Sequence, residues 1–432
     1  NPHFIFKCVK SYTDVMNHKS IRLKRVAGEE FEITEEDAAK AMDRAALRRV
    51  LLELLGTAAD PDLSALDAAD WNALDRIAAQ HRLQPLLDAQ HRLNAGIPVE
   101  IAARWQAAHR VAAMTAMVQQ AELAETCAIL ESRGFAPIAL KGAWLAAHAY
   151  PDPAQRPMRD LDLLVAPEVV IPAFEALLAA GYVQAGPAEM SLAEIVRIDK
   201  HMPPLVAPRG TLIELHQHLW ERDGRLDHAS PLADETVLLG RAEVGANGLR
   251  YLAPEDLLAH LIVHAVYSHR LDCGPLILAD IDLLLRARPI DWPRFWAAAD
   301  EHGWREGARM LLELTAQYRP GLTIDFTTDP GIPTPAALLA AAPDLLLQEL
   351  ESRQSAGLAA AALKDGPSKL AQRITGKRKV TGGAPVTGQT VGTGGRLGWA
   401  SSRVFRTLRD LSHADVRRQS RQLAALSKWL DR

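Results

Sequence analysis

The chain has 432 residues, 48% of them hydrophobic, 24% charged and 5% aromatic, and a formal net charge of −4. This composition is ordinary for a globular protein, and the length allows two or three domains, each with its own core. No apolar run approaches the roughly 18 residues of a membrane span, and the N-terminus lacks the pattern of a signal peptide. The cysteines are odd in number and far apart in the sequence: Cys8, Cys127 and Cys273. This pattern argues against a disulfide framework, so we expect a cytoplasmic protein.

The N-terminal third of the chain is predicted to be helical. Residues 1–45 form an extension to which no role can be assigned. Residues 46–133 are predicted to be a helical domain, because apolar residues recur at helical spacing in three runs. The first run ends at Gly56, the second covers residues 70–87, and the third starts near Pro98 and continues to Gly134.

Residues 134–240 have a different pattern, in which short apolar strands alternate with helices. The segment FAPIAL is short, apolar and bounded by turns, as a buried strand should be. Two later strands flank Pro208-Arg209-Gly210 and predict a hairpin. The predicted order is strand, helix, strand, helix and hairpin, carried by the segments 135–140, 142–150, 160–166, 170–183, 202–207 and 211–219. These elements predict a small mixed sheet with helices, and hence an α+β fold.

The helical pattern returns at residues 250–365, which we predict to be a C-terminal helical domain. Pro254 suits the first position of a helix, and Glu255 and Asp256 suit its first turn. Further helices are expected at 275–287, 292–302, 304–318 and, in Ala-rich sequence, 335–364.

The C-terminal end of the chain is strongly basic. Residues 364–432 contain 15 Lys and Arg but 4 Asp and Glu, a net charge of +11. Residues 375–398 are rich in Gly and Thr and predict a flexible linker. Residues 399–432 predict a basic amphipathic tail that moves independently of the rest and contacts a polyanionic partner. A solvated helix without a specific partner is the alternative.

Two aspartates in the segment 160–165 are the first candidates for chemistry. Side chains alternate along a strand, so Asp160 and Asp162 point the same way while Leu161 and Leu163 enter the core. Two carboxylates one pleat apart repel each other unless a cation lies between them. Mg²⁺ binds a few carboxylates together with phosphate oxygens of a substrate, so the pair indicates phosphoryl-group chemistry.

The chain contains a second copy of the same string, Asp280-Ile281-Asp282-Leu283, which serves as a control. The residues around it repeat at helical spacing, and side chains two apart on a helix point about 200° apart. These aspartates are therefore predicted to be structural, although Asp280 could face a cleft.

Two further features support the first aspartate pair. Lys141-Gly142 lies at a strand-to-helix transition, where glycine permits close approach of a phosphate and free amides attract anions. Glu214 lies in a predicted strand on the same face as His216, and would supply a third carboxylate as ligand or base.

His260 and His264 have a spacing that could hold zinc on a helix, but we favour hydrogen-bonded histidines beside a cleft.

The chain resembles the bacterial group of uncharacterised nucleotidyltransferases within the polymerase-β-like nucleotidyltransferase superfamily. The resemblance covers roughly residues 46–320 and depends on an ordered set of motifs. They are Leu140-Lys141-Gly142, Tyr150, Arg156-Pro157, Asp160 to Val165 and Glu214-Leu215-His216. The sequence departs from the superfamily at Ala143, where a second Gly or Ser is usual, and at Gln217, where this group commonly has an aromatic residue.

The resemblance implies a polymerase-β-like core flanked by helical domains and a transfer of a nucleoside monophosphate from an NTP to an unknown acceptor. It implies Asp160, Asp162 and Glu214 as ligands of Mg²⁺ or Mn²⁺, with Lys141, Gly142 and Arg156 at the nucleotide phosphates. ATP is the expected nucleotide, and His201 and His216 are expected on the acceptor side.

Two alternatives stay open at this stage. One is a degenerate member that senses nucleotides or binds a partner, although the retained carboxylates argue against it. The other is a nucleotidyltransferase that modifies RNA through the basic tail, although no RNA-binding motif is evident.

Overall fold

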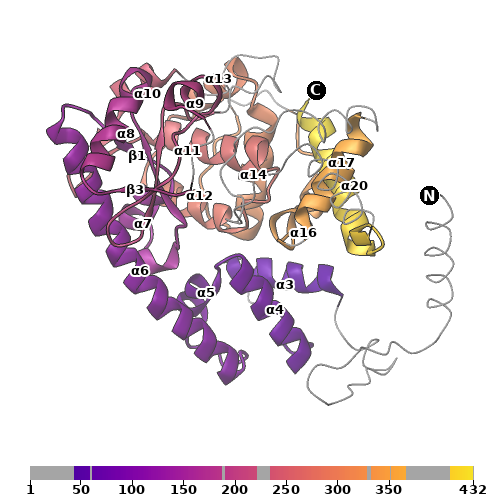
Figure 1. The fold of residues 1–432 in the computed structure, drawn as a ribbon. Helices are drawn as coiled ribbons and strands as arrows, with labels where there is room; N and C mark the ends of the chain where they lie inside the picture. Colours follow the sequence, from indigo (N-terminus) through magenta and orange to yellow (C-terminus); the bar gives the residue numbers. More distant parts are fainter. Residues whose placement is uncertain are drawn as a thin grey trace, which may run out of the picture.

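A mixed β-sheet with helices around it lies on one side of the molecule, at the left in Figure 1. The computed structural model describes residues 43–58, 61–186, 190–220, 234–327, 332–350, 352–365 and 409–431. The predicted N-terminal extension, apart from its last residues, and the predicted linker lie outside these ranges. The α+β class expected from the sequence is confirmed.

The sheet has seven strands in the order β3-β4-β5-β2-β1-β7-β6. The central strand β2 pairs parallel to β5 and antiparallel to β1, so the sheet is mixed. The hairpin predicted around Pro208-Arg209-Gly210 is confirmed, because β4 and β5 pair antiparallel across that turn. The strands are β1 (Ile138–Ala139), β2 (Asp160–Leu164), β3 (Val183–Gln184), β4 (Leu205–Val206), β5 (Leu212–His216), β6 (Glu243–Val244) and β7 (Arg250–Tyr251).

Helices α3 to α6 precede the sheet, and α6 is a single helix of 34 residues. The predicted run 70–87 is divided in the structure, because Arg82 has a left-handed φ of 58°. Pro85 follows at the start of the next helix and has no backbone N–H with which to continue the previous one. The bounds are α3 (Arg44–Leu55), α4 (Ala68–Gln80), α5 (Gln84–His91) and α6 (Val99–Ser132).

Short helices connect the strands and cover the sheet. Helix α7 packs against β2 and α12, whereas α8 packs against β5 and α6. Leu161 and Leu163 of β2 are buried, as the alternation of side chains along the strand predicted. Leu164 is buried as well. The connecting elements are α7 (Gly142–His148), η1 (Pro153–Gln155), η2 (Pro167–Val169), α8 (Val170–Ala179), α9 (Leu192–Ile198) and α10 (Glu235–Arg241).

The predicted helices that follow the sheet are confirmed, and Pro254 begins the first of them. This helix continues into a π-helical segment, η3, that the sequence pattern did not indicate. The Ala-rich run 335–364 is interrupted and forms three helices. The bounds are α11 (Pro254–Ile262), η3 (Val263–Ser268), α12 (Leu276–Ala287), α13 (Trp292–Glu301), α14 (Arg305–Tyr318), α15 (Ala336–Ala340), α16 (Ala342–Leu346) and α17 (Arg353–Asp365).

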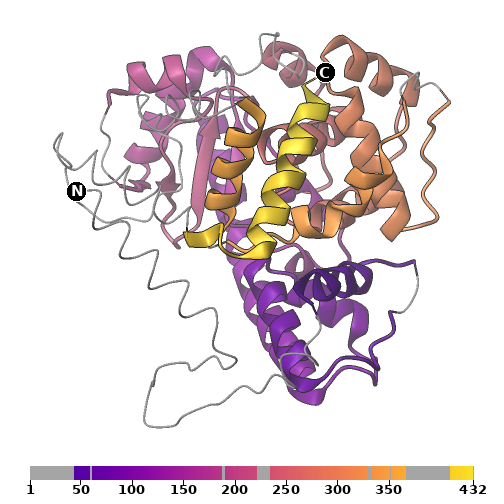
Figure 2. The same ribbon diagram turned by 90° about the vertical axis from the view of Figure 1, so that its right-hand side faces the viewer.

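The expectation of an independently moving tail is wrong for its described part. Residues 414–430 form helix α20 (Ala414–Leu430), which lies beside α17 in Figure 2 and also packs against α16 and α15. Val416, Leu423 and Leu426 are buried there. Burying one apolar side chain contributes about 1.5–3 kcal/mol, so an amphipathic helix gains more by docking than by remaining solvated.

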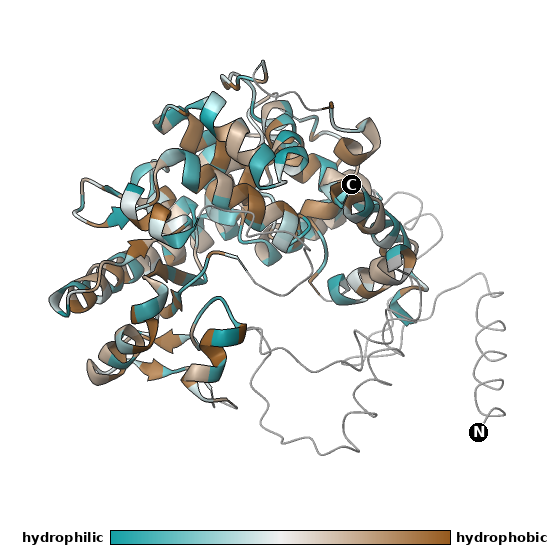
Figure 3. Cartoon of the chain, turned by 90° about the horizontal axis from the view of Figure 1, so that it is seen from above, coloured by the Kyte–Doolittle hydropathy of each residue, from teal (hydrophilic) through white to brown (hydrophobic). Residues whose placement is uncertain are grey.

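A continuous hydrophobic core extends from Leu51 to Leu426. Because this hydrophobic core is continuous, it does not mark where one domain ends and the next begins. The predicted boundaries of the helical domains, 46–133 and 250–365, and of the nucleotidyltransferase domain, 134–240, stay predictions. Figure 3 shows hydrophobic and hydrophilic residues along the same helices, as expected where each helix buries one face. Within the described ranges, no helix has the length and apolar character that crossing a membrane requires.

Candidate active site

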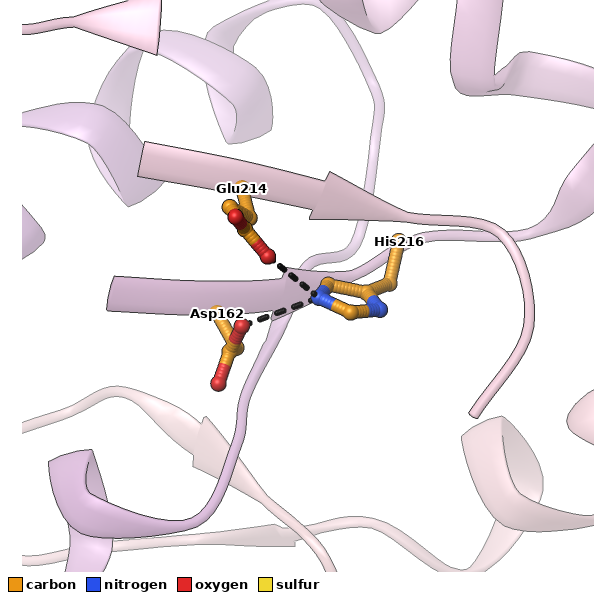
Figure 4. Close-up of side chains that lie close together, drawn as sticks. All are labelled: Asp162, Glu214 and His216. Atoms are coloured by element: carbon orange, nitrogen blue, oxygen red, sulfur yellow. Dashed lines mark hydrogen bonds and ion pairs between the residues drawn. The ribbon is translucent and has the colours of Figure 1, made fainter. Parts of the chain in front are cut away.

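The parallel pairing of β2 with β5 brings two predicted site residues together. Asp162 is directly opposite Glu214 in the register of these strands. His216 follows two residues after Glu214, and its Nε2 lies 2.9 Å from Asp162 Oδ1 and 3.6 Å from Glu214 Oε2. Figure 4 shows the three side chains converging. The strand register thus places His216 against the carboxylates, and its predicted place on the acceptor side stays a prediction.

Lys141 approaches the same carboxylates from the neighbouring strand. It comes two residues after the end of β1, and its Nζ lies 2.9 Å from Asp162 Oδ2. The backbone N–H of Leu140 donates to the carbonyl of Asp162, which fixes this loop to β2. Lys141 itself has a φ of 45°, an uncommon conformation for a residue with a side chain. The chain therefore turns sharply between β1 and α7 in order to bring Lys141 to Asp162.

The two aspartates of β2 have opposite electrostatic environments. Burial favours the neutral form of Asp162, but the charges of Lys141 and His216 outweigh it and hold the pKa of Asp162 well below its usual range. Asp160 lacks such close partners. Burial and then the negative charges of Asp162 and Glu214 raise the pKa of Asp160 to about 6. The negative charge on this face of the sheet is thus only partly compensated by the chain's own cations.

The basic groups respond to the same charges. Burial lowers the pKa of His216, but hydrogen bonds to Asp162 and Glu214 more than offset it, so the pKa is raised. Burial likewise lowers the pKa of Lys141, and the charge of Asp162 outweighs it. For Glu214, burial raises the pKa, and His216 and His201 together make the net shift downward. Glu214 is therefore an ionised carboxylate whose side chain is 20% exposed.

Gly142 lies where the sequence predicted a close backbone approach. A Cβ at this position would lie 2.9 Å from Met158 Sδ and 3.5 Å from Arg156 Nη1. Arg156 therefore reaches the Lys141-Gly142 turn, as its predicted phosphate contact requires. Its Nε and Nη2 are, however, held by Asp280 at 2.7 and 2.9 Å, and Tyr150 also donates to Asp280. The predicted role of Arg156 stays a prediction, with Asp280 as the residue that orients it.

Asp280 and Asp282 lie on helix α12, as predicted. Asp280 accepts from Arg156 and Tyr150, whereas Asp282 forms ion pairs with Arg286 and Arg319, each at 2.7 Å. The same string of residues thus has a structural role on a helix and lines a carboxylate cluster on a strand.

The remaining predicted histidines lie around the carboxylates. His201 forms a β-bridge with His216, and its Nε2 lies 3.9 Å from Glu214 Oε2. His260 is buried in α11, and burial together with the charge of Lys141 holds its pKa well below the usual range. Asp162, Glu214 and His216 form the sole group in the described ranges with three possible metal-ligand atoms close together. His260 and His264 are not part of this group, and their predicted role as hydrogen-bonded histidines beside a cleft stays a prediction.

Other buried polar residues escaped the sequence analysis. Glu122 of α6 is fully buried and accepts from the backbone N–H groups of Arg209 and Thr211 in the β4–β5 turn. His109, also on α6, lies 2.7 Å from Asp88 and 3.1 Å from Asp152. Helical periodicity gave no reason to single out either residue, because their partners are distant in the sequence.

The comparisons with known proteins identify the family of this chain. A family model described as an uncharacterised nucleotidyltransferase matches residues 67–320, which is more than half of the chain. Neither the comparison with curated proteins nor that with solved structures finds a match. The matched range contains both the β2–β5 carboxylates and the Lys141-Gly142 turn. The chain belongs to this family of nucleotidyltransferases.

Proposed function

We propose that the protein transfers a nucleoside monophosphate from an NTP to an acceptor hydroxyl and releases pyrophosphate. The observation that carries this proposal is the group of Asp162, Glu214 and His216 on two adjacent strands beside the Lys141-Gly142 turn, with Asp160 two residues before Asp162 on β2. In such a reaction an acceptor oxygen forms a bond to the α-phosphorus, and the bond from that phosphorus to the β-phosphate oxygen breaks. Alignment and charge neutralisation supply most of the acceleration.

The carboxylates fit a divalent cation such as Mg²⁺ or Mn²⁺. Hard cations prefer oxygen ligands, and the raised pKa of Asp160 reflects repulsion by Asp162 and Glu214 after burial. Asp160, Asp162 and Glu214 would hold the cation, and His216 offers a nitrogen that suits Mn²⁺ better than Mg²⁺. When bound, the cation neutralises phosphate charge and orients the phosphate groups.

The chain's own residues have distinct parts in this proposal. Lys141 and the backbone at Gly142 bind the phosphates, and Arg156 adds a second cation held in place by Asp280. His216 orients Asp162 by its hydrogen bond. Glu214, which is ionised and partly accessible, accepts the proton of the acceptor hydroxyl. His201, whose Nε2 lies 3.9 Å from Glu214 Oε2, contacts the acceptor.

ATP is the nucleotide that we propose, and the acceptor is a small molecule, a peptide or a protein side chain. The test incubates the protein with each of the four α-labelled NTPs and with Mg²⁺ or Mn²⁺. It measures released pyrophosphate and label transferred to the protein or to added acceptors. Label on the protein would identify protein modification. No release with any nucleotide, metal or acceptor class, or equal release by an Asp162→Asn variant, would contradict the proposal.

A further inference from the structure

The outer face of helix α6 is apolar although it is exposed. Trp105 and Leu123, on the inner face, are buried in the core. On the outer face the side chains of Val111, Met114 and Met117 are 65%, 71% and 72% exposed, and α6 runs along the edge of the molecule at the lower left in Figure 1. A surface helix ordinarily carries polar residues on its solvent side, whereas a helix that is hydrophobic all round is a covered one. The outer face of α6 therefore indicates a partner.

Large and small side chains occupy different halves of this outer face. Its residues recur at helical spacing, with large side chains in the N-terminal half and alanines in the C-terminal half: Val111, Met114, Met117, Ala121, Ala124 and Ala128. A second copy of the helix can lie antiparallel on this face, with a twofold axis between Met117 and Val118. Val111 then lies opposite Ala124 of the second copy, and Met114 lies opposite Ala121. Each large side chain is thus opposite a small one, which lets two helices pack closely.

Beyond the first turn of α6, its exposed charges are divided in the same way. Arg104 and Arg110 are in the N-terminal half, and Glu125 and Glu131 are in the C-terminal half. In the antiparallel arrangement, Arg110 is level with Glu125 of the second copy, and Arg104 is level with Glu131. A parallel arrangement would place like charges beside each other, which opposes association. The charge pattern therefore favours an antiparallel second copy as the occupant of this face.

Two of these four charges have no ionic partner within one copy. Arg104 and Glu125 form ion pairs with other parts of the same chain, at 3.0 and 2.7 Å. Arg110 and Glu131 form no ion pair within the ranges that the structure describes. Each ion pair across the twofold axis would therefore include one side chain that is without an ionic partner in a single copy.

We propose that α6 is the interface of a homodimer, in which two copies of the helix pack antiparallel about a twofold axis between Met117 and Val118. A twofold interface has to be self-complementary, and the sizes and the charges of the outer face both have this property about the same point. The inner face stays in the core, where Glu122 holds the β4–β5 turn. Association thus requires no change in the fold of one copy, and it is independent of nucleotidyl transfer.

Sedimentation velocity of the full-length protein, over a wide range of concentration, measures the dimer dissociation constant. Met114→Glu places a charge within the apolar contact and should raise this constant at least about a hundredfold. Ile332→Glu is the matched control and should leave it unchanged, because Ile332 is 85% exposed and lies outside α6. Melting curves establish that each variant is folded. A monomer at every concentration would overturn the proposal and leave the face to a different partner, and a Met114→Glu variant that dimerises as the wild type does would also overturn it.

A charge exchange tests whether the occupant is a second copy. Arg110→Glu and Glu125→Arg each place like charges at the same level of the interface, so each should weaken the dimer about tenfold. The double variant restores opposite charges across the axis and should recover most of the affinity. A double variant that is weaker than both single variants would reject the antiparallel pairing.

Disulfide cross-linking tests the position of the axis. Met117→Cys should form a linked dimer under mild oxidation, because both copies of this position lie beside the axis. Ala103→Cys is the control, since its two copies lie at opposite ends of the interface, roughly 40 Å apart at 1.5 Å per residue. It should give no more linked dimer than the wild type, which reports on the native cysteines. Linked dimer from Ala103→Cys and none from Met117→Cys would show that the helices do not pack antiparallel and would reject the proposal.

Discussion

Asp160 and Asp162 are equivalent in the strand pattern but not in their surroundings. Both point to one face of β2, yet Lys141 and His216 contact Asp162 and leave Asp160 without a close cation. The pKa values of the two carboxylates are accordingly displaced in opposite directions. Such divergence between neighbouring acids is common at functional sites. Asp162 is the carboxylate that the chain's own cations contact, and the proposed metal would compensate the charge of Asp160.

Asp162→Asn should abolish transfer and leave the fold intact. Removing one ligand charge raises the transition-state barrier by several kcal/mol, which lowers the rate about a thousandfold or more. Pyrophosphate release and melting temperature are the two measurements. Asp282→Asn is the matched control, since Asp282 occupies the same position in the second copy of the string but pairs with Arg319. It should lower the melting temperature and keep Mn²⁺ binding. Near-normal turnover of Asp162→Asn would reject the assignment.

Asp160→Asn should stabilise the metal-free protein at neutral pH. The folded pKa of about 6 lies above the ordinary aspartate value of 3.8, so the folded state binds more protons than the unfolded state between these two pH values. The contribution of Asp160 to the free energy of unfolding is then fully present below about pH 4, and it is lost as the pH rises through about 6. Melting curves in the presence of a chelator should place the variant above the wild type at pH 7.5, with the difference vanishing near pH 4. A variant that melts at a lower temperature than the wild type at pH 7.5 would show that burial and the charges of Asp162 and Glu214 do not destabilise ionised Asp160.

At the scale of single residues, the sequence predicted Asp162 and Glu214 on adjacent strands, and the β2–β5 register places them opposite each other; the joint role of Asp160, Asp162 and Glu214 stays a prediction. The contacts of Lys141 and His216 with Asp162 could not be predicted. They depend on the β2–β5 register and on the left-handed turn at Lys141, and neither follows from local sequence. The same limit applies to Arg156 and Asp280, which are far apart in the chain but adjacent in the fold.

Among the elements, long periodic helices were predictable and their interruptions were not. The positions of α6, α11, α12 and α14 agree with the apolar spacing, because each buries one face in the core. The break at Arg82 is different. Apolar residues continue at helical spacing across it, and tertiary contacts of His81 with Gln348 determine where the turn forms. Pro85 was a local indication that the sequence analysis did not use.

Helix α6 also stabilises the hairpin that carries Glu214. Because Glu122 is fully buried and its carboxylate accepts two backbone N–H groups of the turn, Glu122→Gln should lower stability by about 1–3 kcal/mol. Denaturant titration measures the change. Glu125→Gln is the control, because Glu125 is half-exposed and forms a surface ion pair with Arg209, which contributes at most about 1 kcal/mol. Equal effects of the two variants would mean that the buried contact does not hold the turn.

For the whole molecule, charge asymmetry was a misleading guide to the C-terminal segment. A net charge of +11 over residues 364–432 suggested a separate tail. In the structure, Arg418 of α20 pairs with Asp344 of α16, and Asp415 of α20 pairs with Arg48 of α3. Ion pairs of both polarities thus join α20 to the body, one through a basic and one through an acidic residue of the helix. A contact of exposed Arg417 or Arg421 with a polyanion stays a prediction.

The ion pair of Arg48 with Asp415 should make the C-terminal helix part of the folded unit. Arg48 is fully buried, and Asp415 and Asp344 lie 2.6 and 3.0 Å from its guanidinium group. Asp415→Asn removes one of these anions and leaves a buried cation partly uncompensated, so stability should fall by about 1–3 kcal/mol. Arg421→Gln on the exposed face of α20 is the control and should change stability by less than about 0.5 kcal/mol. Denaturant unfolding of both variants should remain a single transition if α20 unfolds with the body. A separate early transition in the wild type, or an Asp415→Asn variant as stable as Arg421→Gln, would mean that the helix is an independent tail after all.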